Sequence, residues 1–371
     1  MGKPLLRVGL IGSGFMGRAH AFAYATAEKV FDLPFRIRLA VLADATPEAA
    51  RAGAEALGFD ASTADWRAVA EGEDVDVVHV TTPNALHAEM AIAALEAGKP
   101  VHCEKPLAPT LAEAVRMAEA AERAALPTQV GFNYLCNPMV RLAARMIEDG
   151  AIGAVRTARF VHAEDYMADA SVPWGFRHDP VGGGVLADLG SHALATAEFL
   201  LGRVGRVLGD CVTVIAERPA EGGPRPVVVD DVARAFLRFV SGASASLEAS
   251  WIATGRTMQH DFEIHGERGA IRFTQERLNE LHLYLTRDPD GLRGFRRIEA
   301  GPAHPPYGRF CVAPGHQLGF NDLKAIEIAG FLDAVAGQAP AAFPFSRGAR
   351  IQALVEAVAR SSAMGVWTEP G

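Results

Sequence analysis

The stretch LLRVGLIGSGFMG at residues 5–17 indicates how the first part of the chain folds. Residues 5–11 form a short apolar run typical of a buried strand, and residues 18–27 are compatible with a helix. Between them lie three glycines in the spacing GxGxxG, at Gly12, Gly14 and Gly17. Glycines also occur in ordinary turns, but the order strand, GxGxxG, helix is typical of a dinucleotide-binding unit.

Each glycine has a physical role in such a unit. Gly12 permits the tight turn, Gly14 lets a pyrophosphate approach the backbone N–H groups, and Gly17 allows close packing of helix on strand. The pyrophosphate is expected at the N-terminus of the helix, where the N–H groups have no partner within the helix. Phe15 and Met16 complete this loop and are predicted to contact the cofactor.

An acidic residue follows the next strand, residues 37–42. Asp44 at this position can accept hydrogen bonds from both ribose hydroxyls of NAD and would repel the 2′-phosphate of NADP. Its distance from Gly17 is longer than usual, and residues 28–34 have the character of an insertion that explains the difference. The alternative role for Asp44 is a helix N-cap, because Pro47 and a helical segment follow it.

Strands and helices then alternate, which predicts a parallel, doubly wound sheet. The segments are strands 75–80, 101–103 and 128–131 and helices 85–97 and 111–124. Ligands bind at the carboxyl ends of strands in such sheets. The loops after two strands therefore supply the next predicted cofactor contacts: Thr82, Pro83, Asn84, His87, Glu104 and Lys105. Lys105 is expected to be functional, with a solvated surface lysine as the alternative.

A second glycine-rich stretch, GGGVLADLGSH, occupies residues 182–192 and leads into an apolar segment that ends near Leu201. On a regular helix Asp188 and His192 share one face, because they are four residues apart. An acid and a base beside a glycine-rich approach indicate the wall of an active site. An ordinary helix N-terminus with a favourably placed Asp would give the same pattern.

The motifs together resemble one enzyme family. GxGxxG is followed by TPN…H at residues 82–87, AGKPVHCEKPLA at residues 97–108 and GGGVLADLGSH, an order similar to that of the Gfo/Idh/MocA oxidoreductases. The resemblance implies an N-terminal Rossmann domain and a C-terminal α/β domain with a large, mostly antiparallel sheet. It also implies that Lys105, Asp188 and His192 form the catalytic set. Leu135 departs from the pattern, because many members carry Arg there.

The fold class predicted for the whole chain is therefore α/β with two domains. Residues 1–131 are expected to form the NAD-binding Rossmann domain, and residues 132–371 the substrate-binding and oligomerisation domain. In the second part the sequence indicates strands 154–161, 207–216, 233–240, 244–251, 259–265, 270–274 and 281–285, and helices 138–150, 182–201, 322–335 and 350–364. The burial of the strand at residues 233–240 stays open, because its apolar residues alternate poorly with polar ones. A homodimer or homotetramer is inferred from the resemblance.

Further candidates for substrate contact are Tyr134, Trp174, Arg177 and His316. A packed Trp174 and a surface Arg177 are the simpler interpretation of those two residues. His316 belongs to a loop at residues 301–317 that is rich in Pro, Gly and His. Loops of this length are often functional, although a surface loop with no role in binding is an equal alternative.

Composition limits the other classes of function. The chain has 371 residues, 49% hydrophobic residues and a formal net charge of -8, which argues against a general nucleic-acid surface. It has no run of about 20 apolar residues, so no membrane span is expected. Its four cysteines are far apart and form no CxxC, which indicates neither a disulfide framework nor a zinc site and favours a reducing cytoplasm. No metal is expected.

The resemblance and the residues predict an NAD-dependent oxidoreductase that oxidises a secondary alcohol of a sugar, inositol or related polyol. We expect His192 to act as the base, Lys105 to bind the reacting oxygen and Asp188 to bind another hydroxyl. NADP is the less favoured cofactor. Two alternatives are an NAD-sensing regulatory protein of the same fold, against which the presence of all three residues argues, and an NAD-dependent glycosidase.

Overall fold

The computed structural model describes residues 2–371 and divides the chain into two compact units. Unit 1 consists of Met1–Cys136 and Gly319–Arg350, and unit 2 of Asn137–Leu318 and Ile351–Gly371. The expected boundary between residues 131 and 132 differs from this division mainly because a segment near the C-terminus belongs to the first unit. Among the described residues, none of the helices has the length and apolar character needed to cross a membrane.

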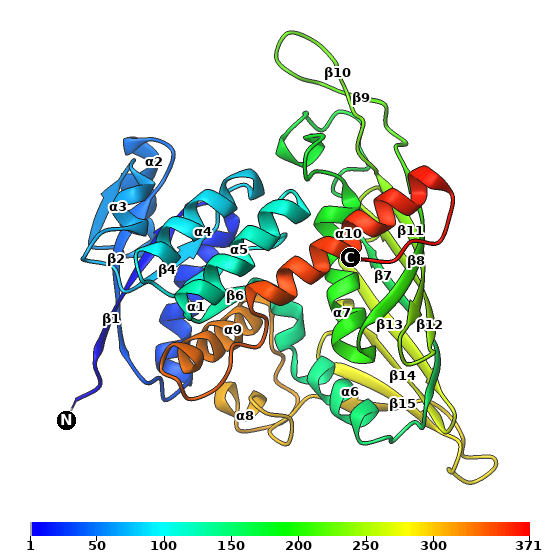
Figure 1. Ribbon diagram of the computed structural model, residues 1–371. Coiled ribbons are helices and arrows are strands. Elements are labelled where there is room, and N and C mark those ends of the chain that lie inside the picture. The colour runs from blue at the N-terminus through cyan, green and yellow to red at the C-terminus, as the bar shows by residue number, and fades with distance from the viewer. Residues whose placement is uncertain (1) are drawn as a thin grey trace. The chain divides into compact units, whose positions relative to one another are not determined.

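Unit 1 is built on a parallel sheet, as predicted, and its six strands follow the order β3-β2-β1-β4-β5-β6 (Figure 1). Its strands are β1 (Leu5–Ile11), β2 (Arg36–Ala43), β3 (Ala61–Thr63), β4 (Val77–Val80), β5 (Val101–Cys103) and β6 (Thr128–Val130). β4, β5 and β6 are buried at every position, which is the pattern of strands covered on both faces. The short β3 was not predicted, because three residues, two of them exposed, carry no periodic signal.

The helices of unit 1 lie between these strands in the chain. They are α1 (Phe15–Val30), α2 (Pro47–Leu57), α3 (Trp66–Ala70), α4 (His87–Glu96), α5 (Leu111–Ala124) and α9 (Phe320–Val335), with 3₁₀ turns η1 (Asn84–Leu86) and η2 (Asn133–Cys136). α1 is longer than expected and takes up the start of the suspected insertion. Thr46 caps α2 by accepting the N–H of Ala49, and Thr110 caps α5 in the same way.

Helix α9 joins this unit although it follows the unit 2 sheet in the chain. It packs against α1 and the turn η2. Ten of its sixteen residues are buried, including Lys324 and Glu327. A helix buried on so much of its surface needs neighbours on several sides, and within unit 1 it finds them beside α1.

Unit 2 contains an eight-stranded sheet in the order β16-β15-β14-β13-β7-β12-β11-β8. Only β7 and β12 pair in parallel, so the sheet is mostly antiparallel, as expected. The strands are β7 (Val155–Ala163), β8 (Val204–Val212), β11 (Val232–Phe239), β12 (Ser244–Ser250), β13 (Gln259–Gly266), β14 (Gly269–Thr274), β15 (Glu280–Leu285) and β16 (Arg296–Glu299). A small hairpin of β9 (Glu217–Arg218) and β10 (Arg225–Pro226) stands apart from it.

The structure shows which side chains of β11, the strand predicted at residues 233–240, are buried. Ala235, Leu237 and Phe239 are buried, whereas Arg234, Phe236 and Arg238 between them are exposed. The alternation was hard to recognise in the sequence because the exposed Phe236 takes a position that a polar residue would normally mark.

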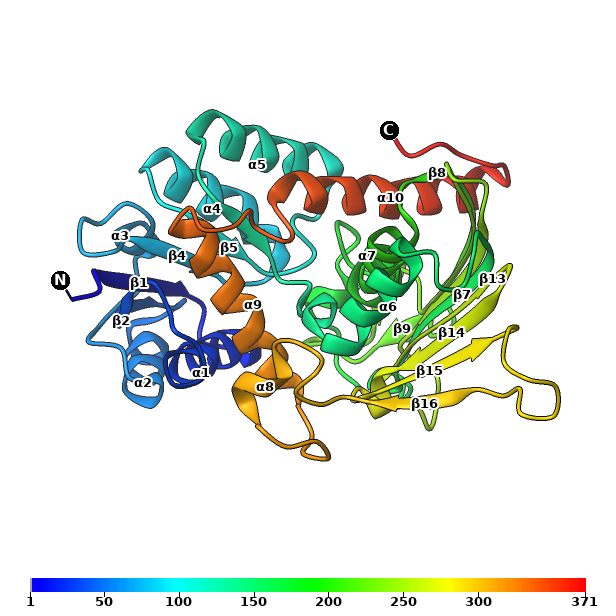
Figure 2. The same cartoon turned by 90° about the horizontal axis from the view of Figure 1, so that it is seen from below.

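Helices α6 (Pro138–Glu148) and α7 (Ser191–Leu201) lie along one face of this sheet, as Figure 2 shows. Unit 2 also contains the 3₁₀ turns η3 (Phe176–His178) and η5 (Gln275–Arg277) and the short helix α8 (Tyr307–Phe310). Helix α10 (Phe345–Met364) contributes residues to both units. The expected regular helix from the glycines to Leu201 is wrong at its start, because Leu186–Gly190 forms a π-helical turn, η4.

Candidate functional site

The glycine loop of unit 1 has the geometry that a dinucleotide requires. Gly12 has φ +99°, which side chains rarely adopt, and a Cβ on Gly17 would lie 2.1 Å from the carbonyl oxygen of Gly12. Gly14 has no atom within 4 Å of its would-be Cβ, so its backbone is open to a ligand. The Thr81 hydroxyl fixes the turn by donating to the Gly12 carbonyl at 2.7 Å. These features fit a pyrophosphate lying on the N-terminus of α1.

Asp44 holds this loop from the end of β2. Its Oδ2 accepts the backbone N–H of Ser13 at 2.8 Å and also the Ser13 hydroxyl, and its Oδ1 accepts the N–H of Ala45 at 2.7 Å. Burial alone would raise the pKa of Asp44, but the hydrogen bonds from Ser13 and Ala45 outweigh it and lower that pKa. The alternative role as a helix cap is wrong, because Thr46 caps α2.

The two predicted cofactor loops, residues 81–84 and 104–106, are joined by His87. Its Nδ1 lies 3.0 Å from the carbonyl oxygen of Pro106, and its Nε2 lies 2.9 Å from that of Thr82. The ring is 1% exposed, and its pKa is lowered, chiefly by burial. His87 therefore acts on the backbone of both loops, while Pro83 is exposed and Asn84 partly exposed beside it.

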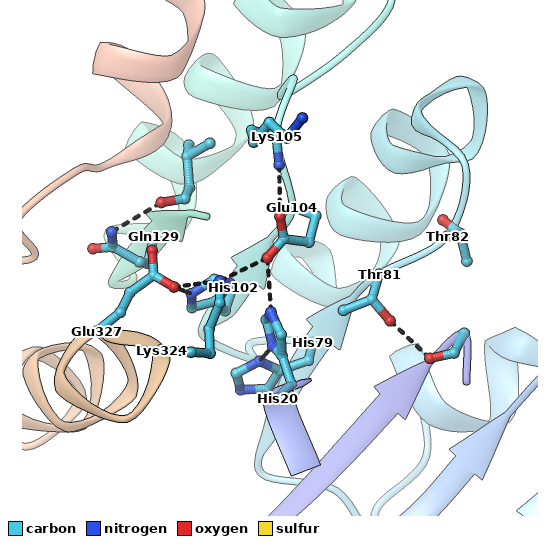
Figure 3. Close-up of polar contacts among 12 residues, drawn as sticks. His20, His79, Thr81, Thr82, His102, Glu104, Lys105, Gln129, Lys324 and Glu327 are labelled. Carbon is cyan, nitrogen blue, oxygen red and sulfur yellow. Dashed lines mark hydrogen bonds and ion pairs between the residues drawn. The ribbon is translucent and has the colours of Figure 1, made fainter. Parts of the chain in front are cut away.

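Lys105 follows β5 and is partly exposed, with a cis peptide bond to Pro106. Its backbone N–H donates to Oε2 of Glu104 at 3.3 Å, as Figure 3 shows. Glu104 itself is only 4% exposed. The sequence placed both residues on one cofactor-facing loop, but the structure gives them different environments, since Glu104 is directed into the domain.

Glu104 is the centre of a buried ionic group. Its Oε1 accepts from the Nζ of Lys324 at 2.8 Å, and Lys324 also donates to Glu327 at 2.5 Å. Burial would raise the pKa of Glu104, but the ammonium of Lys324 and a hydrogen bond from His20 bring it well below its usual value. Burial likewise opposes the charge on Lys324, whose pKa is nevertheless raised by its two carboxylate neighbours. Burial would also raise the pKa of Glu327, but the ammonium of Lys324 lowers it. All three groups are therefore charged at neutral pH.

Three histidines surround this ionic group, and sequence reasoning missed them. His20 belongs to α1, His79 to β4 and His102 to β5, and each is at most 1% exposed. One ring nitrogen of each lies within 4.8 Å of the others, a spacing compatible with a metal site. The only signal in the sequence was a polar ring inside the apolar runs VVHV and VHC, which is unusual for central strands.

In unit 2, Asp188 lies in the π turn η4, where Arg177 and Tyr166 donate hydrogen bonds to it. Its Oδ2 accepts from Nε of Arg177 at 2.7 Å and from the hydroxyl of Tyr166 at 2.8 Å. Burial is the largest cause of a raised Tyr166 pKa, and the charge of Asp188 raises it further. Arg177, a candidate for substrate contact in the sequence, thus lies beside Asp188, whereas Tyr166 was not anticipated because it follows β7 in an irregular segment.

His192 lies in the first turn of α7 and is 6% exposed. Its ring centroid is 5.3 Å from that of His162 on β7 and 6.2 Å from that of His260 on β13. His260 contacts Thr196 of the same helix at 3.0 Å, between Nε2 and the hydroxyl oxygen. The predicted base therefore lies among buried imidazoles, and two of these were not recognised in the sequence.

The remaining candidates have mixed environments. Trp174 is half-buried under the guanidinium of Arg225, 3.4 Å from the ring centroid, in line with a packing role. His316 is exposed, and its carbonyl oxygen accepts the hydroxyl of the buried Tyr307. In unit 1, Tyr134 contacts Phe320 with ring centroids 6.3 Å apart, and Phe320 stacks on the exposed Phe15 at 5.7 Å.

Two further positions can be placed in unit 1. Met16 is partly exposed in the first turn of α1, beside the glycine loop. Leu135, the residue that departs from the pattern of the resembled family, is an apolar side chain only 7% exposed.

Comparison with known proteins adds independent information. Residues 6–132 match the family described as "Oxidoreductase family, NAD-binding Rossmann fold", and residues 140–272 match "GFO/IDH/MocA C-terminal domain". A levoglucosan dehydrogenase of Pseudarthrobacter phenanthrenivorans is 39% identical over 98% of this chain and 98% of its own. An inositol 2-dehydrogenase of Rhizobium meliloti is 29% identical over 96% of this chain and 97% of its own.

Solved structures show the same similarity in three dimensions. A levoglucosan dehydrogenase in complex with NADH and levoglucosan superposes with a TM-score of 0.96, at 39% identity and with 99% of each chain covered. An oxidoreductase domain protein from Kribbella flavida superposes with a TM-score of 0.96, at 40% identity, over 99% of this chain and 100% of its own.

Proposed function

Because the chain belongs to the Gfo/Idh/MocA oxidoreductase family and is an NAD-dependent dehydrogenase of sugars or polyols, we propose that levoglucosan is its substrate. The observation that carries this proposal is the similarity to a levoglucosan dehydrogenase over nearly the whole of both chains, at 39% identity. The inositol 2-dehydrogenase is less similar, at 29% identity, so an inositol becomes the second substrate to test.

The reaction needs a base, a group that stabilises the developing alkoxide, and a hydride acceptor. NAD supplies the last of these when it is bound, by accepting the hydride from the carbinol carbon. We assign the proton to His192, because a neutral imidazole accepts a proton readily near neutral pH. We assign the reacting oxygen to Lys105, whose ammonium is a strong donor.

We assign a second substrate hydroxyl to Asp188. Its carboxylate is held by Arg177 and Tyr166 through Oδ2, and a carboxylate held in this way can accept a hydrogen bond from a substrate hydroxyl. Arg177 and Tyr166 are then positioned to contact the same sugar. For Trp174, Tyr134 and His316 the contact with substrate remains a proposal that rests on the sequence.

For the cofactor we propose that Asp44 binds the ribose and that the backbone at Gly12, Gly14 and Gly17 binds the pyrophosphate. Phe15 and Met16 flank this loop, and the loops carrying Thr82, Asn84 and Glu104 are proposed to approach the nicotinamide side. His87 supports both of these loops through the two carbonyl contacts described above.

The test is a screen for NADH formation with levoglucosan, L-sorbose, myo-inositol and common aldoses. We expect kcat/KM for levoglucosan to exceed that for each other sugar by about tenfold or more, a discrimination that a few specific hydroxyl contacts can provide. A higher kcat/KM for myo-inositol would replace levoglucosan as the assigned substrate without affecting the family.

The two alternative functions predict different results in the same screen. An NAD-sensing regulatory protein would bind NADH but form none with any sugar. An NAD-dependent glycosidase would release sugar from a glycoside with no net NADH. The basis for a dehydrogenase is that Lys105, Asp188 and His192 are all present in a chain whose similar proteins are named dehydrogenases.

We further propose that the protein is a cytoplasmic homodimer or homotetramer that binds neither nucleic acid nor membranes. All four cysteines are thiols, which suits a reducing compartment. The outer face of the unit 2 sheet carries an exposed phenylalanine, Phe236, with 60% of its surface accessible. Such a residue on a broad sheet face is a natural contact for a second subunit.

A further inference from the structure

A continuous chain of hydrogen bonds runs through the interior of unit 1 and ends at Glu104. The Tyr24 hydroxyl lies 2.7 Å from Nε2 of His79, and Nδ1 of His79 lies 2.8 Å from Nδ1 of His20. Nε2 of His20 then lies 2.8 Å from Oε1 of Glu104, as Figure 3 shows for the last three residues. All four side chains are at most 4% exposed, so water does not compete for these contacts.

Only one placement of protons satisfies every bond in this chain while both rings are neutral. Glu104 is ionised and can only accept, so His20 must carry its proton on Nε2. Nδ1 of His20 is then an acceptor, which requires the proton of His79 to be on Nδ1. Nε2 of His79 is in turn an acceptor and takes the proton of Tyr24. Burial lowers the pKa of His20 to about 4 and that of His79 also, so both rings are neutral.

The carboxylate at the end of this chain is held on every side. Oε1 of Glu104 also accepts from Lys324, and Oε2 accepts the backbone N–H of Lys105. A Cβ on Gly131 would lie 2.5 Å from Oε1, so the residue beside the carboxylate must be glycine and leaves no free space there. The rotation of Glu104 is therefore fixed by its donors, and its second oxygen transmits that orientation to the backbone of Lys105.

We propose that Tyr24, His79 and His20, called here the Tyr24 relay, position Glu104 and through it the Lys105 loop. The proposal rests on the role assigned above to Lys105. In this view the three relay residues are positioning residues that never touch the substrate. Their contribution is the orientation of one backbone N–H and hence the direction in which the Lys105 side chain leaves the loop.

A buried metal ion is the competing interpretation of the same histidines, since their nitrogens lie close enough together. It would require one ring-nitrogen lone pair from each histidine, whereas in the relay the lone pair of His20 accepts from His79 and that of His79 accepts from Tyr24. It would also place a cation near the ammonium of Lys324, which is bonded to the same Glu104 oxygen as His20. Hydrogen bonding accounts for His20 and His79 without such an ion.

The kinetic test compares His20→Leu, which removes the donor to Glu104, with His20→Gln, whose amide can still donate. We expect His20→Leu to lower kcat about tenfold or more with a change in KM below about threefold, because small misplacements of a catalytic group are costly. The deuterium isotope effect with deuterated NADH in the reduction direction should increase, since hydride transfer becomes slower than the other steps. His20→Gln should regain part of kcat.

A control variant and a milder variant distinguish an effect on catalysis from a loss of folding. Thr128→Val removes a buried hydroxyl that accepts the backbone N–H of Phe345 in the same unit, and it should change neither kcat nor the isotope effect. Tyr24→Phe keeps the ring and removes only the first donor of the relay, so it should lower kcat less than His20→Leu. Wild-type values of kcat and isotope effect in both relay variants would overturn the proposal.

A spectroscopic arm is independent of any enzymatic activity. In protein labelled with ¹⁵N-histidine, the relay predicts slowly exchanging protons on Nδ1 of His79 and Nε2 of His20, and Tyr24→Phe should shift both signals. If the wild type oxidises no sugar, these signals still test the relay, and the failure belongs to the proposed function. Absence of the signals, or one metal ion per chain that is lost in His79→Phe, would overturn it.

Discussion

At the scale of single residues, Lys105 has the most testable role. Replacing it by Met removes the ammonium and keeps the aliphatic chain, so the loop is expected to stay in place. We expect turnover to fall about 10²–10³-fold, the usual cost of removing one donor to a developing oxyanion. Binding of NADH, measured by fluorescence titration, should change little. Near-normal turnover would show that Lys105 is an ordinary surface charge.

His192 should make the rate of oxidation depend on pH, because only a neutral imidazole can accept the substrate proton. We expect kcat in the oxidation direction to rise with pH and reach a plateau. His192→Asn should lose about 10²–10⁴-fold in kcat, the typical contribution of a general base, and lose the rise. The measurement is a pH–rate profile of both proteins at saturating NAD. A variant that retains the rising limb would identify another group as the base.

Asp44 should determine the choice between the two nicotinamide cofactors. We expect the wild type to use NAD more efficiently than NADP, because the carboxylate repels the 2′-phosphate. Asp44→Asn removes the charge but retains an oxygen that can accept the N–H of Ser13. The variant should therefore show a smaller preference for NAD in steady-state kinetics with both cofactors. Equal use of the two cofactors by the wild type would contradict the ribose role.

At the scale of elements, the π turn η4 depends on a carboxylate from outside it. Oδ2 of Asp230 accepts the backbone N–H of Leu186 at 2.7 Å. A Cβ on Gly184 would lie 2.3 Å from Oδ1 of the same residue, so the glycine permits this close approach. Burial raises the pKa of Asp230 to about 6, although the N–H of Leu186 acts in the opposite direction.

A raised pKa means that the folded state binds the proton of Asp230 more tightly than the unfolded state does. The stability from this group is thus fully present below its unfolded pKa and is lost as pH rises through about 6. Asp230→Asn cannot ionise and still offers an oxygen to Leu186. The wild type should therefore lose stability between acidic and neutral pH, whereas the variant should not. The difference in free energy of unfolding, variant minus wild type, should rise by on the order of 1–3 kcal/mol over this range. Urea titrations at both pH values measure this difference, and a difference independent of pH would contradict it.

The glycine-rich stretch at residues 182–192 does not continue as one regular helix into α7. Four residues of regular helix separate two side chains by about one turn, and this was the reason to place Asp188 and His192 on one face. The structure shows a π turn at Leu186–Gly190, so the regular helix assumed there is not formed. Asp188 contacts Tyr166 and Arg177, whereas His192 lies beside His162. π-helical turns are frequent at functional sites, which agrees with the role proposed here.

At the scale of the whole molecule, the outer face of the unit 2 sheet should join subunits. Phe236 is on the face opposite the buried Ala235 and Leu237, next to Leu208 and Ser246 in register. We expect light scattering after size exclusion to give the mass of a dimer or tetramer. Phe236→Glu should shift this mass toward that of the monomer, because it places a charge in an apolar contact.

Leu292→Glu provides the matched control for Phe236→Glu. Leu292 is 77% exposed, in the segment between β15 and β16 and outside the sheet. This change should leave the mass unaltered. If the wild type elutes as a monomer, or if both variants behave alike, the outer face is not an interface.

The sequence by itself determined the features that depend on short stretches of chain. The alternation of strands and helices predicted the parallel sheet, and β5 and α5 have the predicted bounds. The position of a loop after its strand is also local, so Lys105 could be placed directly after β5, whereas the buried environment of Glu104 was not foreseen. The large antiparallel sheet and the activity followed from the motifs, which resemble a known family and carry little of their meaning singly.

Only the tertiary structure decided which polar groups pair with each other inside the core. Lys324 reaches Glu104 across 220 residues of sequence, and nothing near Lys324 in the chain indicates its partner. The same holds for His20 and His79, which are 59 residues apart. Burying a charge or an imidazole is favourable only when a matching group is buried beside it. The match is a property of the packed core, so periodicity and spacing along the chain predict which segments are buried but not which polar groups pair within them.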